Sequence, residues 1–251
     1  MTTLTIVQLY PDLLGVTGDR GNVAVLQSRL ASAGITAQVA TVHAGEPLPD
    51  EFDIVVIGNG PLSAMRRVAD DLSAKAEPLR AHVDAGGVIF AVGGGAELLS
   101  TGVQTLDGDA VPGLGLLPFR VRRTRQRRVG YIVADTEDGE LIGFEDHAST
   151  WDLDAGASVY GRVAAGKGSI GPEGLGGESV RSVNAFATNV QGPVLPLNPQ
   201  LADAVLRAAC ARRGVDYVPG GSLANADALA EAARTDIRRL TTGKKPTVMS
   251  I

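Results

Sequence analysis

Short apolar runs separated by amphipathic stretches dominate the first hundred residues of the chain. Three runs are apolar at nearly every position, which is typical of buried strands, and a fourth alternates apolar and polar residues, which predicts a half-buried strand. The intervening stretches have leucines at helical spacing and end at glycine or contain proline, so they predict helices. The predicted strands cover residues 4–9, 53–57, 88–92 and 35–42, and the predicted helices cover 22–33 and 62–85, with a break at Pro78. This alternation indicates an α/β fold with a doubly wound, mainly parallel sheet and helices on both faces.

The pattern is less regular between residues 101 and 188. Apolar segments at 129–134 and 179–187 predict hairpins or edge extensions of the sheet, whereas residues 161–177 hold seven glycines and predict a mobile surface loop. Helical stretches then cover residues 200–213 and 223–240. We therefore expect one domain over residues 1–215, followed by a C-terminal helical extension and basic tail over residues 216–251.

Composition narrows the class of protein. The apolar fraction of 44% favours a folded globular chain, and the net charge of −5 gives no electrostatic reason to expect nucleic acid as a partner. No apolar run approaches the roughly 20 residues that span a bilayer, and the N-terminal segment lacks a signal-peptide pattern, so we expect a cytoplasmic protein without a transmembrane segment. The single cysteine, Cys210, excludes an intramolecular disulfide, and we expect no metal site and no cofactor in this chain.

The segment VIFAVGGGAELLS, residues 88–100, has the form of a strand–turn–helix elbow. Three glycines, 93–95, follow the apolar strand directly, and helix-forming residues come next. In acyl-transfer enzymes such an elbow carries a nucleophile at its apex and directs backbone amides at the reacting group. No Ser, Cys or Thr stands at this apex, so the segment by itself is equally consistent with a tight turn that performs no chemistry.

Five ordered segments carry a resemblance to a known family. They are YPDLLGVTGDRGNVAVLQSRL near the N-terminus, IGNGP after the 53–57 strand, AVGGGAELLS, GFEDH at 143–147 and QGPVLPLNP at 191–199. Together they resemble the CobB/CobQ-like class I glutamine amidotransferases, and among these the GatD-type glutaminase subunits of lipid II isoglutaminyl synthases. The resemblance covers most of residues 4–215 and implies a class I glutamine-amidotransferase-like (flavodoxin-like) fold. It also implies a substrate pocket that contains Gly58, Asn59, Gly60, Gly94 and Gly95.

The departures from the family pattern fall on the residues that perform its chemistry. Gly93 stands where the family has its nucleophilic Cys, and Gln191 stands where it has the general-base His. Ala96 and Glu97 replace an aromatic residue and a Gln, and the loop at 58–62 lacks the Gln of its family counterpart. Glycine cannot form a thioester, and a neutral amide does not accept a proton at physiological pH. We therefore expect no intact catalytic residue, and an old glutamine pocket enlarged by the smaller side chains at positions 93 and 96.

Other polar candidates have structural alternatives. His147, in GFEDH, matches a retained family segment and predicts either a role in the pocket or at an interface, or a structural hydrogen bond. The run RVRRTRQRR, residues 120–128, predicts a solvated strand face or an interface with an acidic partner or a phosphorylated precursor. By resemblance, Arg127 and Arg128 lie near the active-site side, and Arg128 is a candidate pocket residue. Cys210 sits at helical spacing from apolar residues and predicts a small buried hydrophobe.

One further motif has the spacing of a phosphate-binding loop. GRVAAGKG, residues 161–168, reproduces the Gly-x₄-Gly-Lys pattern. Gly168 replaces the required Ser or Thr, and glycines rather than a helix follow, so we interpret the match as coincidental.

The resemblance implies a subunit of a ligase complex. In the resembled complexes a Mur-ligase-family partner (MurT) uses ATP and Mg²⁺ to activate the D-glutamate α-carboxylate of a lipid-linked peptidoglycan precursor, and the glutaminase subunit supplies ammonia. We expect a heterodimer with a MurT-like partner. The lipid-linked substrate would bring this complex to the inner face of the membrane. With no glutaminase, the partner would use a free amine, either ammonia or a small amino acid such as glycine. The alternative hypothesis is a non-catalytic regulatory or scaffold protein with an amidotransferase fold.

Overall fold

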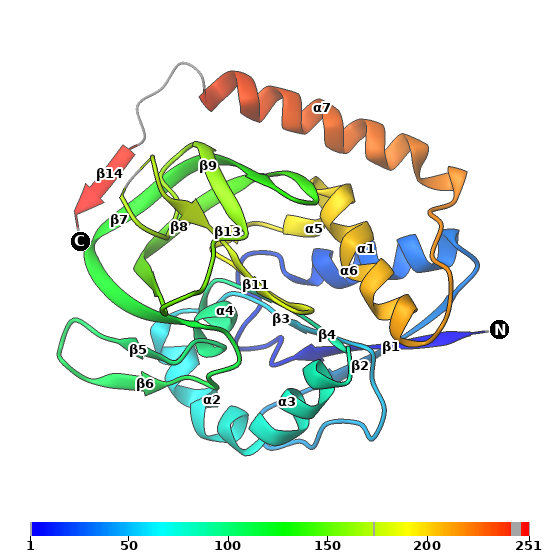
Figure 1. Cartoon of the computed structure of the whole chain (residues 1–251), viewed down its shortest axis with the longest axis horizontal. Helices are drawn as coiled ribbons and strands as arrows, with labels where there is room; N and C mark the ends of the chain where they lie inside the picture. The colour runs from blue at the N-terminus through cyan, green and yellow to red at the C-terminus, as the bar shows by residue number, and fades with distance from the viewer. Residues whose placement is uncertain (1, 173, 242–246, 251) are drawn as a thin grey trace.

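The computed structural model describes residues 2–172, 174–241 and 247–250. A six-stranded sheet runs through its centre in the order β11-β12-β4-β3-β1-β2, parallel except for the antiparallel pair at the β11 edge (Figure 1). The strands are β1 (Thr3–Leu9), β2 (Thr36–Val42), β3 (Ile54–Ile57), β4 (Val88–Val92), β11 (Val180–Ser182) and β12 (Ala185–Thr188). The four strands predicted in the first hundred residues are thereby confirmed. The segment 179–187 contributes β11 and most of β12, an antiparallel pair at the sheet edge, as predicted for a hairpin or edge extension.

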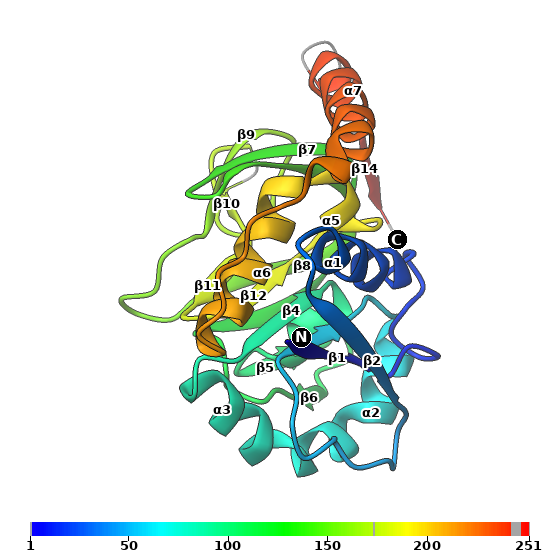
Figure 2. The same cartoon turned by 90° about the vertical axis from the view of Figure 1, so that its right-hand side faces the viewer.

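Helices cover both faces of this sheet (Figures 1 and 2). The helices on one face are α1 (Arg20–Ser32), α5 (Val194–Leu197) and α6 (Pro199–Arg212), and those on the other are α2 (Leu62–Ala74) and α3 (Ala76–Asp84). Successive residues of β3 point to opposite faces, so Ile54 and Val56 pack with α1 and α6, whereas Val55 and Ile57 pack with α2 and α3. This is the predicted doubly wound α/β arrangement.

The break in the 62–85 helix lies three residues before the predicted position. α2 ends at Ala74, Lys75 separates the two helices, and Pro78 is the third residue of α3. The first turn of a helix has no internal acceptors for its N–H groups, so proline is tolerated there without loss of a hydrogen bond. The proline therefore begins the second helix rather than ending the first.

A second sheet is built around a long antiparallel hairpin of β7 (Phe119–Thr136) and β8 (Gly139–Leu153), green in Figure 1. Its remaining strands are β5 (Gly102–Gln104), β6 (Ala110–Pro112), β9 (Gly161–Ala165), β10 (Gly177–Glu178), β13 (Val190–Gln191) and β14 (Thr247–Ser250). The segment 129–134 lies within β7, as predicted for a hairpin strand.

The glycine-rich segment 161–177 is only in part the surface loop that its composition predicts, since Gly171, Pro172, Gly174 and Leu175 are exposed whereas residues 167–170 are buried. It begins as β9 and then returns through a turn in which Lys167, Ser169 and Ile170 are all buried. The backbone N–H groups of Lys167 and Gly168 donate to the Glu145 carboxylate, each at 2.9 Å. The N–H of Ser169 donates to Glu178 in the same way. Two buried carboxylates thus accept the backbone hydrogen bonds that a neighbouring strand would otherwise accept.

The C-terminal part contains a short 3₁₀ turn, η1 (Gly221–Leu223), and the helix α7 (Ala224–Thr241), which crosses the upper edge of the molecule in Figure 1. Only Ala230 and Arg234 of α7 are buried. Arg234 donates to Oδ1 of Asn198 at 2.7 Å and to the carbonyl oxygen of Glu140 at 3.0 Å. The division at residue 215 stays a prediction. No helix within the described residues is long and apolar enough to cross a membrane.

A buried arginine connects three parts of the fold. Arg29 of α1, whose side chain is 3% exposed, donates to both carboxylate oxygens of Asp203 in α6 at 2.7 and 2.8 Å. It also donates to Asp227 of α7 at 2.7 Å, while the hydroxyl of Tyr217 donates to Asp203 at 2.6 Å. This cluster fixes α7 against the helices that cover the sheet.

We predict that Arg29→Ala lowers the free energy of unfolding by about 3 kcal/mol, because it leaves the largely buried Asp203 carboxylate without its counter-charge. Urea denaturation with an unchanged m-value would measure the loss. The matched control is Arg66→Ala, which breaks a solvent-exposed pair with Asp107 and should cost less than about 0.5 kcal/mol. Equal losses in the two variants would contradict a special role for Arg29.

Candidate functional site at the carboxyl ends of the central strands

The strand–turn–helix elbow is present at the carboxyl end of β4. Gly93 follows the strand with φ 52° and ψ −120°, a conformation that strains residues with a side chain, and the short helix α4 (Gly94–Leu98) begins immediately after it. The Gly93 amide donates to the carbonyl oxygen of Thr188 in β12 at 2.8 Å. The backbone of an acyl-transfer elbow is therefore in place, with glycine at its apex.

The glycine triplet lies directly against the loop that follows β3. An added Cβ at Gly94 would lie 2.5 Å from the carbonyl oxygen of Gly60, and one at Gly95 would lie 2.5 Å from that of Gly58. The Gly95 amide also donates to the Gly58 carbonyl at 3.2 Å. Glycine is thus required at 94 and 95 because two backbone segments pack together there.

Position 93 has a different neighbour. An added Cβ at Gly93 would lie 2.2 Å from Oδ1 of Asn59. The same Oδ1 accepts a hydrogen bond from the Gly94 amide at 2.8 Å. In a nucleophile elbow, the amide that follows the nucleophile is one that stabilises the oxyanion. The Asn59 carboxamide therefore accepts the hydrogen bond of this amide, and it also fills the space that a side chain at position 93 would need.

The expected enlargement of the pocket is wrong. The Asn59 side chain fills the volume beside Gly93 that a larger residue would take. Ala96 is fully buried among the apolar residues that pack between the sheet and α2, so its small side chain adds no space to a pocket. The pocket is therefore not enlarged at position 93, where Asn59 fills the space, nor at position 96, which lies in the apolar core.

A cavity of about 390 Å³ lies beside the elbow. It is bounded by the loops after β1, β3 and β4, by the adjoining parts of β7 and β8, and by the β12–β13 segment. The lining residues are Val16, Thr17, Asn59, Gly60, Pro61, Gly94, Glu97, Arg123, Arg127, Asp146, His147, Ala148, Asn189 and Gln191. Ligand sites of open α/β sheets fall at this end of the strands, so the cavity is the candidate functional site.

Gln191 lies in this site as the last residue of β13. It is 7% exposed, and its Nε2 donates to the backbone carbonyl of Asp146 at 2.9 Å. An amide held in this way positions β8 against β13 but offers no nitrogen that could take a proton from a nucleophile. The hydrogen bond of the Gln191 side chain is therefore a structural one.

A buried ion pair connects the elbow helix to the hairpin. Glu97 of α4 is 1% exposed and pairs with the guanidinium of Arg123 in β7. Its other oxygen accepts from the Ser149 hydroxyl at 2.6 Å, and Asn189 donates to the same hydroxyl at 3.3 Å. Burial raises the pKa of the Glu97 carboxyl, and the Arg123 charge opposes that shift. This network forms one wall of the cavity.

The six arginines of residues 120–128 are in three different environments. Arg120, Arg122 and Arg125 are exposed, which agrees with the predicted solvated strand face. Arg123 and Arg127 are half-buried at the cavity, where Arg127 pairs with Asp146. Arg128 is buried behind the cavity, and its guanidinium donates to the carbonyl oxygen of Gly168. The run is therefore not a uniform basic surface.

His147 lies on the cavity wall with its ring buried. Its Nδ1 is 3.1 Å from the carbonyl oxygen of Ser149, which makes Nδ1 the protonated nitrogen of a neutral ring. Nε2 is 4.0 Å from Oε2 of Glu145. Burial, with the nearby Arg128 charge, lowers the pKa of His147 to about 3, and burial raises the pKa of Glu145 to about 7.

The other sequence candidates lie away from this chemistry. Lys167 of the GRVAAGKG segment is 3% exposed within the second sheet rather than at a helix N-terminus. Cys210 is fully buried in the core between the sheet and α6, as predicted, and burial raises the pKa of its thiol to about 11. No group of three or more His, Cys, Asp or Glu side chains arranged to hold a metal ion occurs in the described ranges.

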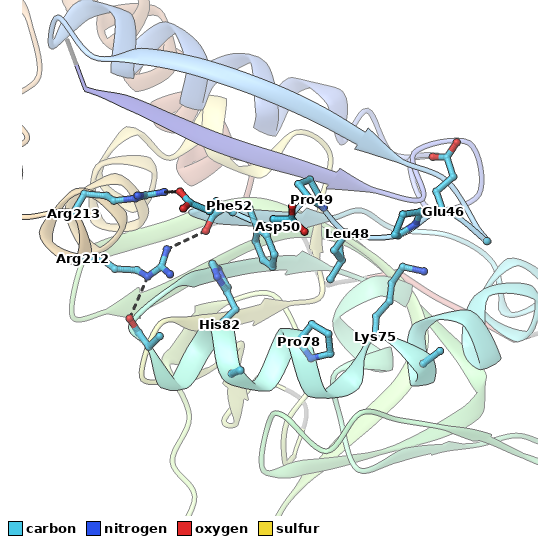
Figure 3. Close-up of a pocket in the computed structure, with 16 residues that line it drawn as sticks. Glu46, Leu48, Pro49, Asp50, Phe52, Lys75, Pro78, His82, Arg212 and Arg213 are labelled. Atoms are coloured by element: carbon cyan, nitrogen blue, oxygen red, sulfur yellow. Dashed lines mark hydrogen bonds and ion pairs between the residues drawn. The ribbon is translucent and has the colours of Figure 1, made fainter.

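A larger cavity, of about 1000 Å³, extends along α3, with Arg212 and Arg213 at one end and Glu46 and Lys75 at the other (Figure 3). It lies between the segment 45–52, α3 and the end of α6. Its arginines are used in structural contacts: Arg212 donates to the carbonyl oxygens of Phe52 and Ala85, and Arg213 pairs with Asp53. We assign no function to this cavity.

The structure brings together five of the nine residues singled out in the sequence. Asn59, Gly60, Gly94, His147 and Gln191 line the cavity, whereas Gly58, Gly93, Gly95 and Arg128 lie behind its surface. Sequence reasoning did not identify Thr17, Arg123, Asp146 or Asn189 as site residues. Arg123 and Glu97 are 26 residues apart, and no local spacing signals their pairing.

Comparison with known proteins agrees with this fold. The chain belongs to the CobB/CobQ-like glutamine amidotransferase family, whose domain model matches residues 5–198. It is 30% identical over 221 residues to the GatD subunit of the glutamine-hydrolysing lipid II isoglutaminyl synthase of Staphylococcus aureus strain N315, covering 87% of this chain and 89% of that protein. The GatD subunit of Streptococcus pneumoniae strain R6 is 30% identical over 204 residues, covering 79% of this chain and 77% of that protein.

Solved structures support the same fold at lower identity. A glutamine amidotransferase crystal structure superposes with a TM-score of 0.57 at 20% identity, covering 81% of this chain and 98% of the other. A glutamine amidotransferase from Thermotoga maritima gives a TM-score of 0.53 at 12% identity, covering 95% and 94%. The class I amidotransferase-like fold expected from the resemblance is confirmed.

We predict that His147 makes folding stability depend on pH. The unfolded histidine binds a proton below about pH 6.5, whereas the folded ring stays neutral to about pH 3, so in this window the unfolded chain binds more protons. Its contribution to stability therefore falls as the pH is lowered from 7 to 5. The free-energy difference between wild type and His147→Gln, measured by urea denaturation at several pH values, should shrink on acidification. A difference that does not change with pH would contradict this assignment.

Proposed function

We propose that this chain is a GatD-like subunit that has lost glutaminase activity and works with an ATP-dependent ligase that modifies lipid II. The observation that carries the proposal is the elbow: its apex is glycine, and its oxyanion amide is bound to Asn59. Loss of the nucleophile of an acyl-transfer site lowers turnover by about 10⁶-fold, or roughly 8 kcal/mol. Gln191 at the base position adds a second loss, since its amide cannot accept the proton.

The partner follows from the relatives. Both are subunits of lipid II isoglutaminyl synthase by name, and each matches more than three quarters of this chain. We infer a MurT-like ligase of the Mur family as the partner in a heterodimer. That ligase would hold ATP and Mg²⁺ and activate the D-glutamate α-carboxylate of the lipid-linked precursor, at the cytoplasmic face of the membrane.

The chemistry then moves to the partner subunit. The ligase would convert the carboxylate to an acyl phosphate with ATP, and an unprotonated amine would attack its carbonyl carbon. The C–N bond forms as the C–O bond to phosphate breaks, phosphate leaves, and the nitrogen loses a proton to solvent. The amine can therefore come from solution when no glutamine is hydrolysed. Ammonia would give an amide, and a small amino acid such as glycine would give an aminoacyl product. The amidotransferase-like chain would contribute binding surface and shape beside the ligase site.

The test is a reaction with the co-purified pair. The complex is incubated with lipid II, ATP, Mg²⁺ and one candidate nitrogen source at a time: glutamine, ammonium or glycine. We expect a product mass shift with a free amine and none with glutamine, and no glutamate released from glutamine by this chain. Glutamate release at a rate above that of a boiled control would overturn the proposal.

A matched control separates this function from a scaffold role. The same ligase assayed without this chain should lose most of its activity if the chain is a working subunit. Full activity of the ligase alone, or no stable association, would favour the non-catalytic regulatory or scaffold protein. The variant Gly93→Cys with Gln191→His restores both lost side chains, yet should remain without glutaminase activity, because Asn59 still occupies the elbow amide.

A further inference from the structure

We infer that the Asn59 side chain occupies the place beside the Gly94 amide where the carboxamide of a substrate would bind. In this position it closes the site at the elbow to any acyl group and to any nucleophile. This deepens the proposed function and rests on it, since closure has biological meaning only if glutaminase activity is absent. The inference depends on three features: which atoms Asn59 contacts, what obstructs position 93, and what remains when the obstruction is removed.

The first feature is chemical mimicry. The side chain of asparagine ends in a primary carboxamide, the group that a glutaminase would cleave. Its Oδ1 lies 2.8 Å from the Gly94 amide nitrogen, at hydrogen-bond distance from the group that would stabilise the oxyanion of a substrate. A buried amide satisfied by the protein gains nothing from a second acceptor, so a substrate oxygen would have to displace Asn59.

The second feature is the nature of the obstruction. At Gly94 and Gly95 an added Cβ would meet backbone carbonyl oxygens, which cannot move without shifting the loop. At Gly93 the three nearest atoms all belong to the Asn59 side chain: Oδ1 at 2.2 Å, Cγ at 2.5 Å and Cβ at 2.9 Å. The nearest obstruction in the space of the nucleophile is therefore one side chain rather than backbone, although the positive φ of Gly93 would still strain any residue with a side chain.

The third feature is how Asn59 is held. Its backbone N–H donates to Oδ2 of Asp19 at 3.1 Å, and Asp19 is itself 1% exposed. The same Asp19 oxygen accepts from the Thr17 hydroxyl at 3.1 Å. The loop is thus anchored from behind, so changes confined to the Asn59 side chain should open the subsite without moving the loop.

The first experiment is a double-mutant cycle on thermal stability of the isolated chain. Gly93→Ala should lower the Tm by about 5 °C through overpacking, and Asn59→Gly should recover most of that loss, with Asn59→Ala intermediate because its Cβ remains. The backbone strain at position 93 is common to both backgrounds and cancels in the cycle. The matched control is Gly94→Ala, whose destabilisation Asn59→Gly should not relieve. Additive effects of Asn59→Gly and Gly93→Ala would overturn the inference.

Two further measurements report access to the subsite directly. In Asn59→Gly alone, hydrogen exchange of the Gly94 amide should accelerate by at least about tenfold, because its acceptor is gone. In Gly93→Cys, iodoacetamide should label the new thiol at least about tenfold faster when Asn59→Gly is also present, with wild type reporting the baseline of the buried Cys210. Unchanged exchange, or equal labelling with and without Asn59, would overturn closure.

These outcomes are independent of the ligase reaction. All of them use the isolated chain, so failure of the closure leaves the free-amine reaction of the complex untouched. Conversely, glutamate release by the wild-type chain would overturn the proposed function whatever the labelling rates show.

Discussion

The structure around the candidate site depends on the close packing of two backbone segments at the carboxyl edge of the sheet, the loop after β3 and the turn after β4. Glycines 94 and 95 bring the second segment against the carbonyl oxygens of the first, and parallel pairing of β3 with β4 brings both segments to the same edge. The Gly94 amide is buried by this packing and needs an acceptor, because an unpaired buried N–H is costly. Asn59 supplies the acceptor for Gly94, and so the same constraint that builds the elbow also closes it.

Buried charge connects the second sheet to this edge. Glu97 leaves the elbow helix and pairs with Arg123 of the hairpin, and the Ser149 hydroxyl and Asn189 complete the network. A buried ion pair contributes little net stability, but leaving either member unpaired is costly, so such pairs fix relative position more than they add free energy. The family pattern has a Gln at the position of Glu97. In this chain Glu97 fixes the hairpin against the elbow, which is a structural use of a position in the elbow helix.

Much of the central fold could be predicted from the sequence. Strands β1 to β4 and the helices between them follow directly from apolar periodicity, because each element buries one or both faces by the same rule along its length. The prediction of a surface loop was wrong for residues 161–170, which form β9 and a buried turn. The seven glycines of the segment 161–177 indicate flexibility by composition, yet Glu145 and Glu178 bind its amides, and no local pattern announces Glu145, which lies 22 residues from Lys167. The helix break was also predicted at Pro78 but lies at Lys75, because proline can begin a helix as well as end one.

The sequence by itself determined that positions 93 and 191 lack a nucleophile and a base, because the absence of a reactive atom is a property of the residue type and needs no coordinates. It also determined the strand–turn–helix form of the elbow, through an apolar run followed by three glycines. Only the tertiary structure decided what became of the vacated space. A sequence shows that a side chain is smaller, but which neighbour moves in depends on distances between loops 34 residues apart, as between Asn59 and Gly93. The space at position 93, which the sequence predicts to be open, is instead filled, because close packing leaves few voids unfilled and because a buried amide requires an acceptor.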